Sequence, residues 1–135
     1  MKIIVDANPI ISMLIKPGKP IDLFLVDELE LVSSELLFQE VSRNKDEIIR
    51  KSRLSEDEVD KFIAIIKKNV KIIPEKYFIK HRSKAEEICP HEKDIVYFAL
   101  ALYLRCPLWT NEKRLKEQNE IEVYSTHELM KNLGL

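Results

Sequence analysis

The chain has 135 residues, of which 45% are hydrophobic and 33% are charged, a balance typical of a soluble globular protein. Because this length suits one domain and no repeat, low-complexity segment or linker interrupts the sequence, we expect a single domain over residues 1–135. The 22 basic and 23 acidic residues nearly cancel, so a uniformly basic nucleic-acid-binding protein is excluded and any such surface must be a local patch.

Short apolar segments alternate with longer amphipathic segments along the chain. In chain order we predict a strand at 2–5, helices at 8–15 and 20–28, a strand at 30–32, helices at 34–44, 45–52 and 55–69, a strand at 70–73, helices at 81–89 and 92–105, a strand at 107–110, a helix at 112–118, a strand at 121–124 and a helix at 126–132. This alternation favours an α/β fold, a three-layer α/β/α sandwich with a central parallel sheet.

The helix predicted over 55–69 has the clearest start signal. Ser55 and Glu58 have the spacing of a capping box, in which each side chain bonds to the backbone of the other residue. The apolar residues that follow recur at the spacing of one helix face: Val59, Phe62, Ile63, Ile66 and Val70.

Cys89 and Cys106 are the only cysteines, too few for the disulfide framework of a small secreted domain. We expect both to be reduced core thiols. His81, His91 and His127 show no ligand spacing with either thiol, so a Cys/His metal site is not expected.

No segment has the features of a membrane anchor or signal. Asp6 and Asn8 interrupt the first apolar run too early for a signal peptide. The longest apolar stretch, 95–104, is much shorter than the ~20 residues of a membrane span. We expect a soluble, cytoplasmic protein without membrane contact, and the many Lys, Glu and Ile residues with few Gln suggest a thermophilic source.

The scarcity of glycine excludes several phosphate-binding motifs. Gly18 and Gly134 are the only glycines, so the chain contains neither a P-loop nor a dinucleotide fingerprint. No serine has the flanking glycines of a nucleophile elbow.

Four acids occupy positions near the predicted ends of strands. Asp6 ends the first strand, Glu40 lies in the helix after the second, Asp94 begins an apolar helix, and Glu112 follows the Leu108-Trp109 strand. In a parallel sheet these four carboxylates would point into one cavity, where they repel one another unless they take up protons or share a cation. Oxygen ligands without Cys or His select Mg²⁺ or Mn²⁺, ions suited to phosphodiester hydrolysis.

Each acid also has a purely structural interpretation. Asp6 could be the N-cap of the next helix, Glu40 a solvated helix residue, Asp94 a favourable charge in a first helical turn and Glu112 an ordinary acid at a helix start. Their number and their common position at strand ends support the site as strongly as these alternatives.

The same residues resemble, in the same order, the PIN (PilT N-terminus) domain family, and the resemblance covers nearly the whole chain. The matching segments are Asp6-Ala7-Asn8 with Ser12, Glu40-Val41-Ser42-Arg43, Asp94 before an Ala/Leu helix, and Thr110-Asn111-Glu112-Lys113-Arg114-Leu115.

The resemblance implies a metal-dependent ribonuclease that cuts single-stranded RNA, with Mg²⁺ or Mn²⁺ as cofactor. It further implies a homodimer and, as in toxins of VapBC-type pairs, an antitoxin partner. Asp6, Glu40, Asp94 and Glu112 would be the catalytic, metal-binding acids. The polar residues that would orient these acids and water are Asn8, Ser12, Thr110 and Asn111.

Glu112 departs from the family pattern, which has an aspartate at this position. The extra methylene would make it ligate through water or hold a second metal poorly, so an RNA-binding or assembly module with a weak or silent metal site is the alternative. Basic residues beside the acids could contact an RNA backbone or be ordinary surface charges: Arg43, Lys113, Arg114 and Lys116. His91 and Glu92 add polar groups near the cavity mouth.

Overall fold

A computed structural model describes the whole chain, residues 1–135, and contains one five-stranded sheet. The strands are β1 (Lys2–Val5), β2 (Glu30–Ser34), β3 (Val70–Ile73), β4 (Leu108–Trp109) and β5 (Val123–Tyr124). The α-helices are α1 (Ala7–Ile15), α2 (Leu36–Arg43), α3 (Lys45–Ser52), α4 (Glu56–Asn69), α5 (Arg82–Ile88), α6 (Ile95–Leu104) and α7 (Thr126–Asn132). The 3₁₀ helices are η1 (Lys19–Phe24), η2 (Glu75–Tyr77), η3 (Ile79–His81), η4 (Glu92–Asp94) and η5 (Lys113–Glu117).

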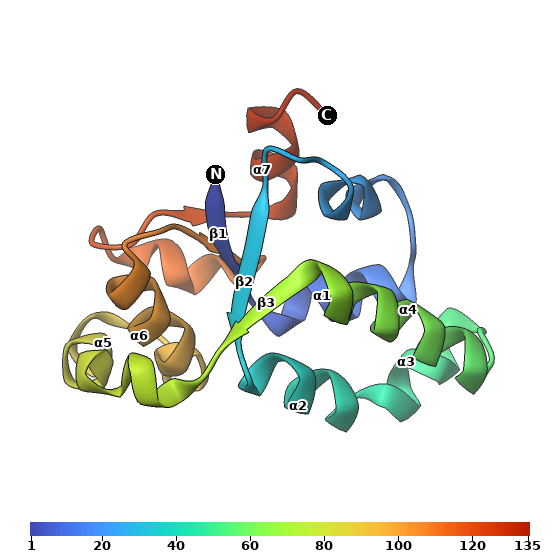
Figure 1. Cartoon of the computed structure of the whole chain (residues 1–135), viewed down its shortest axis with the longest axis horizontal. Coiled ribbons are helices and arrows are strands. Elements are labelled where there is room, and N and C mark those ends of the chain that lie inside the picture. The colour runs from blue at the N-terminus through green and yellow to red at the C-terminus, as the bar shows by residue number, and fades with distance from the viewer.

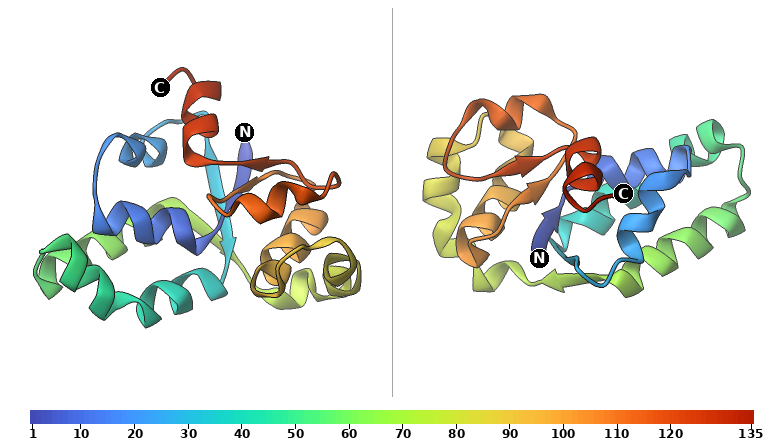
Figure 2. Two further views of the ribbon diagram at one scale, coloured as in Figure 1. Left: turned by 180° about the vertical axis from the view of Figure 1, so that it is seen from behind. Right: turned by 90° about the horizontal axis from the view of Figure 1, so that it is seen from above.

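Helices cover both faces of the sheet. The helices α1 to α4 lie on one side and α5 and α6 on the other, and the two opposite views agree on this arrangement (Figures 1 and 2). The predicted three-layer α/β/α sandwich with a parallel central sheet is therefore confirmed.

The order of the strands determines where a site can form. All strand pairs are parallel, and the order across the sheet is β3-β2-β1-β4-β5. From β1 the chain moves outward through β2 and β3, then returns to the other side of β1 to form β4 and β5. The strand order thus reverses between β1 and β4, where Ile4 pairs with Leu108 and Val5 with Trp109. Ligands of open α/β sheets bind at such a reversal, outside the carboxyl ends of the strands.

The central strand β1 separates two hydrophobic clusters. Ile3 and Val5 face the cluster that includes residues of α1 to α4, whereas Ile4 faces the cluster that includes α5 and α6. This division follows from the alternation of side chains along a strand. All three residues are fully buried, which explains why the strand is apolar between the exposed Lys2 and Asp6.

The capping box predicted at residue 55 is present. Ser55 Oγ accepts from the Glu58 backbone N–H at 3.1 Å, and Glu58 Oε1 accepts from the Ser55 N–H at 3.2 Å. Val59 and Ile66 then bury the face of α4 that packs on the sheet. This helix follows the predicted period over its whole length.

Several boundaries differ from the prediction. The helix predicted over 20–28 is the shorter 3₁₀ helix η1, with Pro20 in its first turn, and the helix predicted over 112–118 is the 3₁₀ helix η5. The helix predicted over 92–105 starts as η4, and regular α-helix begins only at Ile95. Such 3₁₀ turns are common in connectors and at helix ends, where i to i+3 bonds tighten the chain. The last two strands are also shorter than predicted, two residues each.

Both thiols are free, as expected, but they are only partly buried against the edge of a hydrophobic cluster and are not core residues. No helix combines the length and the apolar character that crossing a bilayer requires.

The central strand provides a test of the core. Replacing fully buried Ile4 by Ala removes side-chain volume from a packed cluster and should lower the free energy of unfolding by about 2–5 kcal/mol. Leu25→Ala is the control, because Leu25 is 73% exposed and should change stability by less than about 0.5 kcal/mol. Urea denaturation followed by circular dichroism measures both variants, and equal costs would contradict the assigned core.

Candidate functional site

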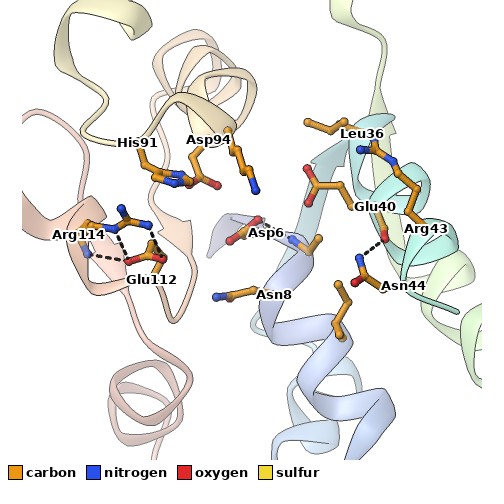
Figure 3. Close-up of a pocket in the computed structure, with 13 residues that line it drawn as sticks. Asp6, Asn8, Leu36, Glu40, Arg43, Asn44, His91, Asp94, Glu112 and Arg114 are labelled. Atoms are coloured by element: carbon orange, nitrogen blue, oxygen red, sulfur yellow. Dashed lines mark hydrogen bonds and ion pairs between the residues drawn. The ribbon is translucent and has the colours of Figure 1, made fainter. Parts of the chain in front are cut away.

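A cavity of about 590 Å³ opens at the carboxyl ends of β1 and β4, where the strand order reverses. The four predicted acids, Asp6, Glu40, Asp94 and Glu112, all line it. Figure 3 shows Asp6 between Glu40 on one side and Asp94 and Glu112 on the other. The fold thus brings together residues that lie more than one hundred positions apart in the sequence.

Asp6 is both the N-cap of α1 and a wall residue of the cavity. Its Oδ1 accepts from the Ala7 N–H at 2.7 Å, and its Oδ2 accepts from the Thr110 hydroxyl at 2.7 Å. Its backbone N–H donates to the Trp109 carbonyl, which continues the ladder between β1 and β4. The Asp6 carboxylate caps α1 and lines the cavity at the same time. The structural interpretation of Asp6 and the site interpretation are therefore compatible.

A small polar network fixes the loop after β4 onto the end of β1. Asn8 Oδ1 accepts from the Asn111 N–H at 3.1 Å, and Thr110 Oγ1 accepts from the Glu112 N–H at 3.1 Å. Asn111 Oδ1 accepts from the Thr126 N–H at 2.8 Å, which connects this loop to α7. Asn8, Thr110 and Asn111 thus occupy positions around the acids.

Ser12 does not join this network. It lies on an exposed position of α1, its side chain forms no hydrogen bond, and it does not line the cavity. Ile11, the residue before it, still lines the cavity, so the Ser12 side chain points away from the wall and not into it.

Burial and mutual repulsion raise the pKa values of the inner acids. The pKa of Asp6 rises to about 6, mainly through burial and then through the Asp94 charge, against the opposing hydrogen bond from Thr110. The pKa of Glu40 rises to about 7, mainly through burial and then through Asp6 and Asp94, with Arg43 acting in the opposite direction. These groups are close enough that each destabilises the charge of the others.

Asp94 is the third inner acid. Burial raises its pKa, whereas His91 acts against this rise. His91 Nδ1 lies 3.0 Å from Asp94 Oδ2 and donates a hydrogen bond when that nitrogen carries the proton. The Asp94 side chain caps no helix, although the residue immediately precedes α6. Its carboxylate is therefore not engaged in capping α6 and remains available to the cavity.

Glu112 differs from the other three acids because Arg114 already binds it. Arg114 Nε lies 3.1 Å from Glu112 Oε1, and the second guanidinium nitrogen lies 3.4 Å from Oε2. Glu112 Oε1 also caps η5 by accepting from the Arg114 backbone N–H. These contacts hold the pKa of Glu112 below its usual value. The departure seen in the sequence thus coincides with a different electrostatic environment.

The basic residues divide into two groups. Arg43 and Arg114 line the cavity, whereas Lys113 and Lys116 do not, and Lys116 pairs with Glu128 of α7. Lys93 and Asn44 also line the cavity, although neither was predicted from the sequence as a site residue. Lys93 directly precedes Asp94 and Asn44 follows Glu40 by four positions, so their proximity to the acids could have indicated them.

The donor set suits a hard divalent cation, but the side chains are not arranged as a coordination shell. No group of three or more His, Cys, Asp or Glu side chains is close enough together to hold a metal ion. The chemistry of the residues nevertheless fits a cation. Three acids line one cavity, and the pKa values of Asp6 and Glu40 are raised to about 6 and 7. A shared cation would offset the repulsion between them.

The raised pKa of Asp6 gives a pH test in the metal-free protein. The folded protein keeps this proton up to about pH 6, whereas the unfolded chain releases it near 3.8, so folded stability falls as pH rises between these values. At about 1.4 kcal/mol per pKa unit, full ionisation of Asp6 costs about 3 kcal/mol. Asp6→Asn should remove this fall, so its gain over the parent grows between pH 4 and pH 7.

Urea denaturation in EDTA at several pH values measures this difference. Asp27→Asn is the matched control, because Asp27 is exposed and lies before β2, at the opposite end of the strands. Its difference from the parent should stay constant with pH. A constant difference for Asp6→Asn as well would show that burial and the Asp94 charge do not raise the pKa of Asp6.

Three solved structures share this fold. PAE2754 from Pyrobaculum aerophilum matches with a TM-score of 0.71 and 13% identity over 99% of this chain and 90% of its own. VapBC2 from Rickettsia felis, bound to a DNA fragment from its promoter, matches with a TM-score of 0.68 and 15% identity over 93% and 98%. VapBC-1 from nontypeable Haemophilus influenzae matches with a TM-score of 0.63 and 16% identity over 94% and 99%. At these identities the likeness shows the fold alone.

Comparison with curated proteins gave no significant match. The family model described as "PIN domain" matches residues 4–129, which include the second half of β1, all four acids and most of α7. The members of this family are generally nucleases. The resemblance seen in the sequence motifs is thereby confirmed, and the chain belongs to the PIN domain family.

Proposed function

We propose that this protein is an Mg²⁺- or Mn²⁺-dependent endoribonuclease that hydrolyses phosphodiester bonds of single-stranded RNA. The observation that carries this proposal is the convergence of Asp6, Glu40 and Asp94, from three separate elements, in one cavity at the strand-order reversal. Membership of a family that generally consists of nucleases supports it.

Asp6, Glu40 and Asp94 would hold the cation, and Glu112 would complete the set. When bound, such a cation activates water and stabilises the charge on the leaving oxygen. The protein contributes the orientation: Thr110 and the Ala7 N–H fix both oxygens of Asp6, and His91 fixes one oxygen of Asp94. Outer partners of this kind determine ligand direction and basicity.

The rim of the cavity suits an anionic substrate. Arg43, Lys93 and Arg114 line it together with the acids, so a phosphate backbone would meet positive charge beside the reacting centre. Lys113 and Lys116 lie outside the cavity and would contact RNA farther along the strand.

A toxin role within a toxin–antitoxin pair is the biological setting that we propose. Two of the structurally similar proteins are VapBC proteins. By this analogy the chain would form a homodimer in the cytoplasm and bind an antitoxin protein. Because the likeness to those structures shows the fold alone, a co-purification experiment with the product of the neighbouring gene is the direct test.

The second candidate is a PIN-fold RNA-binding or assembly module with a weak metal site. The observation that favours it is the contact between Glu112 and Arg114, which neutralises one of the four acids. In that case RNA would bind without being cleaved.

Metal binding is tested by melting temperature. Mn²⁺ binds only the folded state, so at a free concentration about 100 times Kd it should add about 2.7 kcal/mol to stability and raise the melting temperature. Asp6→Asn and Asp94→Asn should lose most of this shift, and cleavage of single-stranded RNA should fall by more than about 10²-fold.

Asp27→Asn should behave like the parent in both assays, and EDTA should abolish cleavage by the parent. If Asp6→Asn keeps the full Mn²⁺ shift, Asp6 is not a ligand. A parent protein that binds RNA in Mn²⁺ but does not cleave it would favour the binding module.

Glu112 is tested by changing its length and its charge separately. Glu112→Asp shortens the side chain by about 1.5 Å and should break the two-point contact with Arg114, and displacements of ~1 Å can cost about 10²-fold in rate. We therefore expect Glu112→Asp to reduce cleavage and Glu112→Gln, which keeps the length but loses the charge, to abolish it. Cleavage under Mg²⁺ titration measures both, and two variants as active as the parent would make Glu112 a surface acid outside the site.

A further inference from the structure

Tyr97 carries a hydroxyl whose position the core does not explain. The residue lies in the first turn of α6 and is fully buried among apolar side chains. Its hydroxyl is the one buried side-chain polar atom of the structure that has no hydrogen-bond partner. Buried polar groups are nearly always paired, so an unpaired one indicates a partner or a role that is still to be found.

The hydroxyl of Tyr97 faces the acid cluster from behind the cavity wall. Tyr97 follows Asp94 by three positions, which places both on the same side of the helix start. Burial is the main cause of the raised pKa of Tyr97, and the Glu40, Asp6 and Asp94 carboxylates add to it in that order. Tyr97 in turn lowers the pKa of Glu40, so the two groups are neighbours. Tyr97 itself does not line the cavity.

Glu40 is the one of the three acids whose carboxylate has neither oxygen paired, which makes it the most available acceptor for this hydroxyl. Both oxygens of Asp6 already accept, from the Ala7 N–H and from Thr110, and Asp94 has His91. The Glu40 carboxylate has no hydrogen-bond partner, because Asn44 donates only to the Glu40 backbone carbonyl. A phenol is a donor at neutral pH and a carboxylate is an acceptor, so the two unpaired groups complement each other.

We propose that Tyr97 is a positioning residue for Glu40, donating its hydroxyl hydrogen bond to the Glu40 carboxylate and thereby fixing the direction of that acid in the cavity. Asp6 is oriented by Thr110 and Asp94 by His91, and Tyr97 gives the third inner acid an equivalent partner. This inference rests on the proposed function insofar as Glu40 is taken to hold the cation.

Tyr97→Phe removes the hydroxyl and leaves the ring that fills the core. In EDTA the variant should stay folded and melt close to the parent, because the ring still fills the core and only the hydroxyl with its hydrogen bond is lost. Its affinity for Mn²⁺, measured by calorimetric titration, should fall about 10- to 100-fold, the usual effect of losing a group that orients a metal ligand. Tyr103→Phe, on the same helix with Tyr103 38% exposed, is the matched control and should change neither quantity.

A double-mutant cycle then identifies the group through which Tyr97 acts. In a Glu40→Gln background, Tyr97→Phe should cause no further loss of Mn²⁺ affinity. An equal loss in both backgrounds would overturn the proposal, as would a Tyr97→Phe protein with parental Mn²⁺ affinity.

Mn²⁺ binding by the parent, Asp6→Asn and Tyr97→Phe separates a failure of the metal site from a failure of the Tyr97 role. If the parent binds Mn²⁺ no better than Asp6→Asn does, the metal site itself is refuted, and the role of Tyr97 with it. If the parent binds Mn²⁺ and Tyr97→Phe binds it equally well, only the role of Tyr97 is refuted.

Discussion

The hydrogen bond from Thr110 to Asp6 is the contact on which the site depends. It joins the residue that ends β1 to the residue that follows β4, at the point where the strand order reverses. The backbone continues the same connection, because the Asp6 N–H donates to the Trp109 carbonyl. With these two ends fixed, α1 and the loop before η5 start from defined positions, and the cavity lies between them.

The fold keeps the inner acids in a state that is unfavourable without a partner. Asp6 is 5% exposed and Asp94 8% exposed; burial raises the pKa values of both, and the Asp94 charge raises that of Asp6 further. A carboxylate that only capped a helix would gain nothing from such surroundings. Functional sites typically reduce the stability of the folded protein. Here the buried charges of the acids reduce it, and a bound cation or proton would restore it.

Glu112 differs from the three inner acids in the contacts that its side chain makes. Its longer side chain reaches the guanidinium of Arg114 with both oxygens while still capping η5. The acid therefore lines the cavity as a neutralised pair, unlike the three inner acids, and it also brings Arg114 to the rim. The same contact supports an active site with an ordered fourth acid and a binding module with a weakened one.

The sequence by itself determined the fold class, the family and the four acids. The alternation of short apolar strands with amphipathic helices is a local property, and so are the capping box at Ser55 and Glu58 and the apolar Ile3-Ile4-Val5 run of β1. Because strands in such sheets end at one edge, the acids after them could be expected to meet there. Local signals were weakest in the connectors, where Pro20 and short 3₁₀ turns replaced predicted α-helices.

Only the tertiary structure decided which side chains these acids meet. Lys93 and Asn44 reach the cavity, whereas Ser12 and Lys116 do not. This difference depends on how each helix is rotated against the sheet, and residue spacing does not determine that rotation. The Tyr97 hydroxyl is the clearest case. In the sequence Tyr97 belongs to an apolar run typical of a core helix, and only the packing of α6 against β1 and β2 brings its side chain near the acid cluster. Hydrogen bonding and desolvation depend on distances between segments far apart in the chain, and those distances exist only once the sheet has formed.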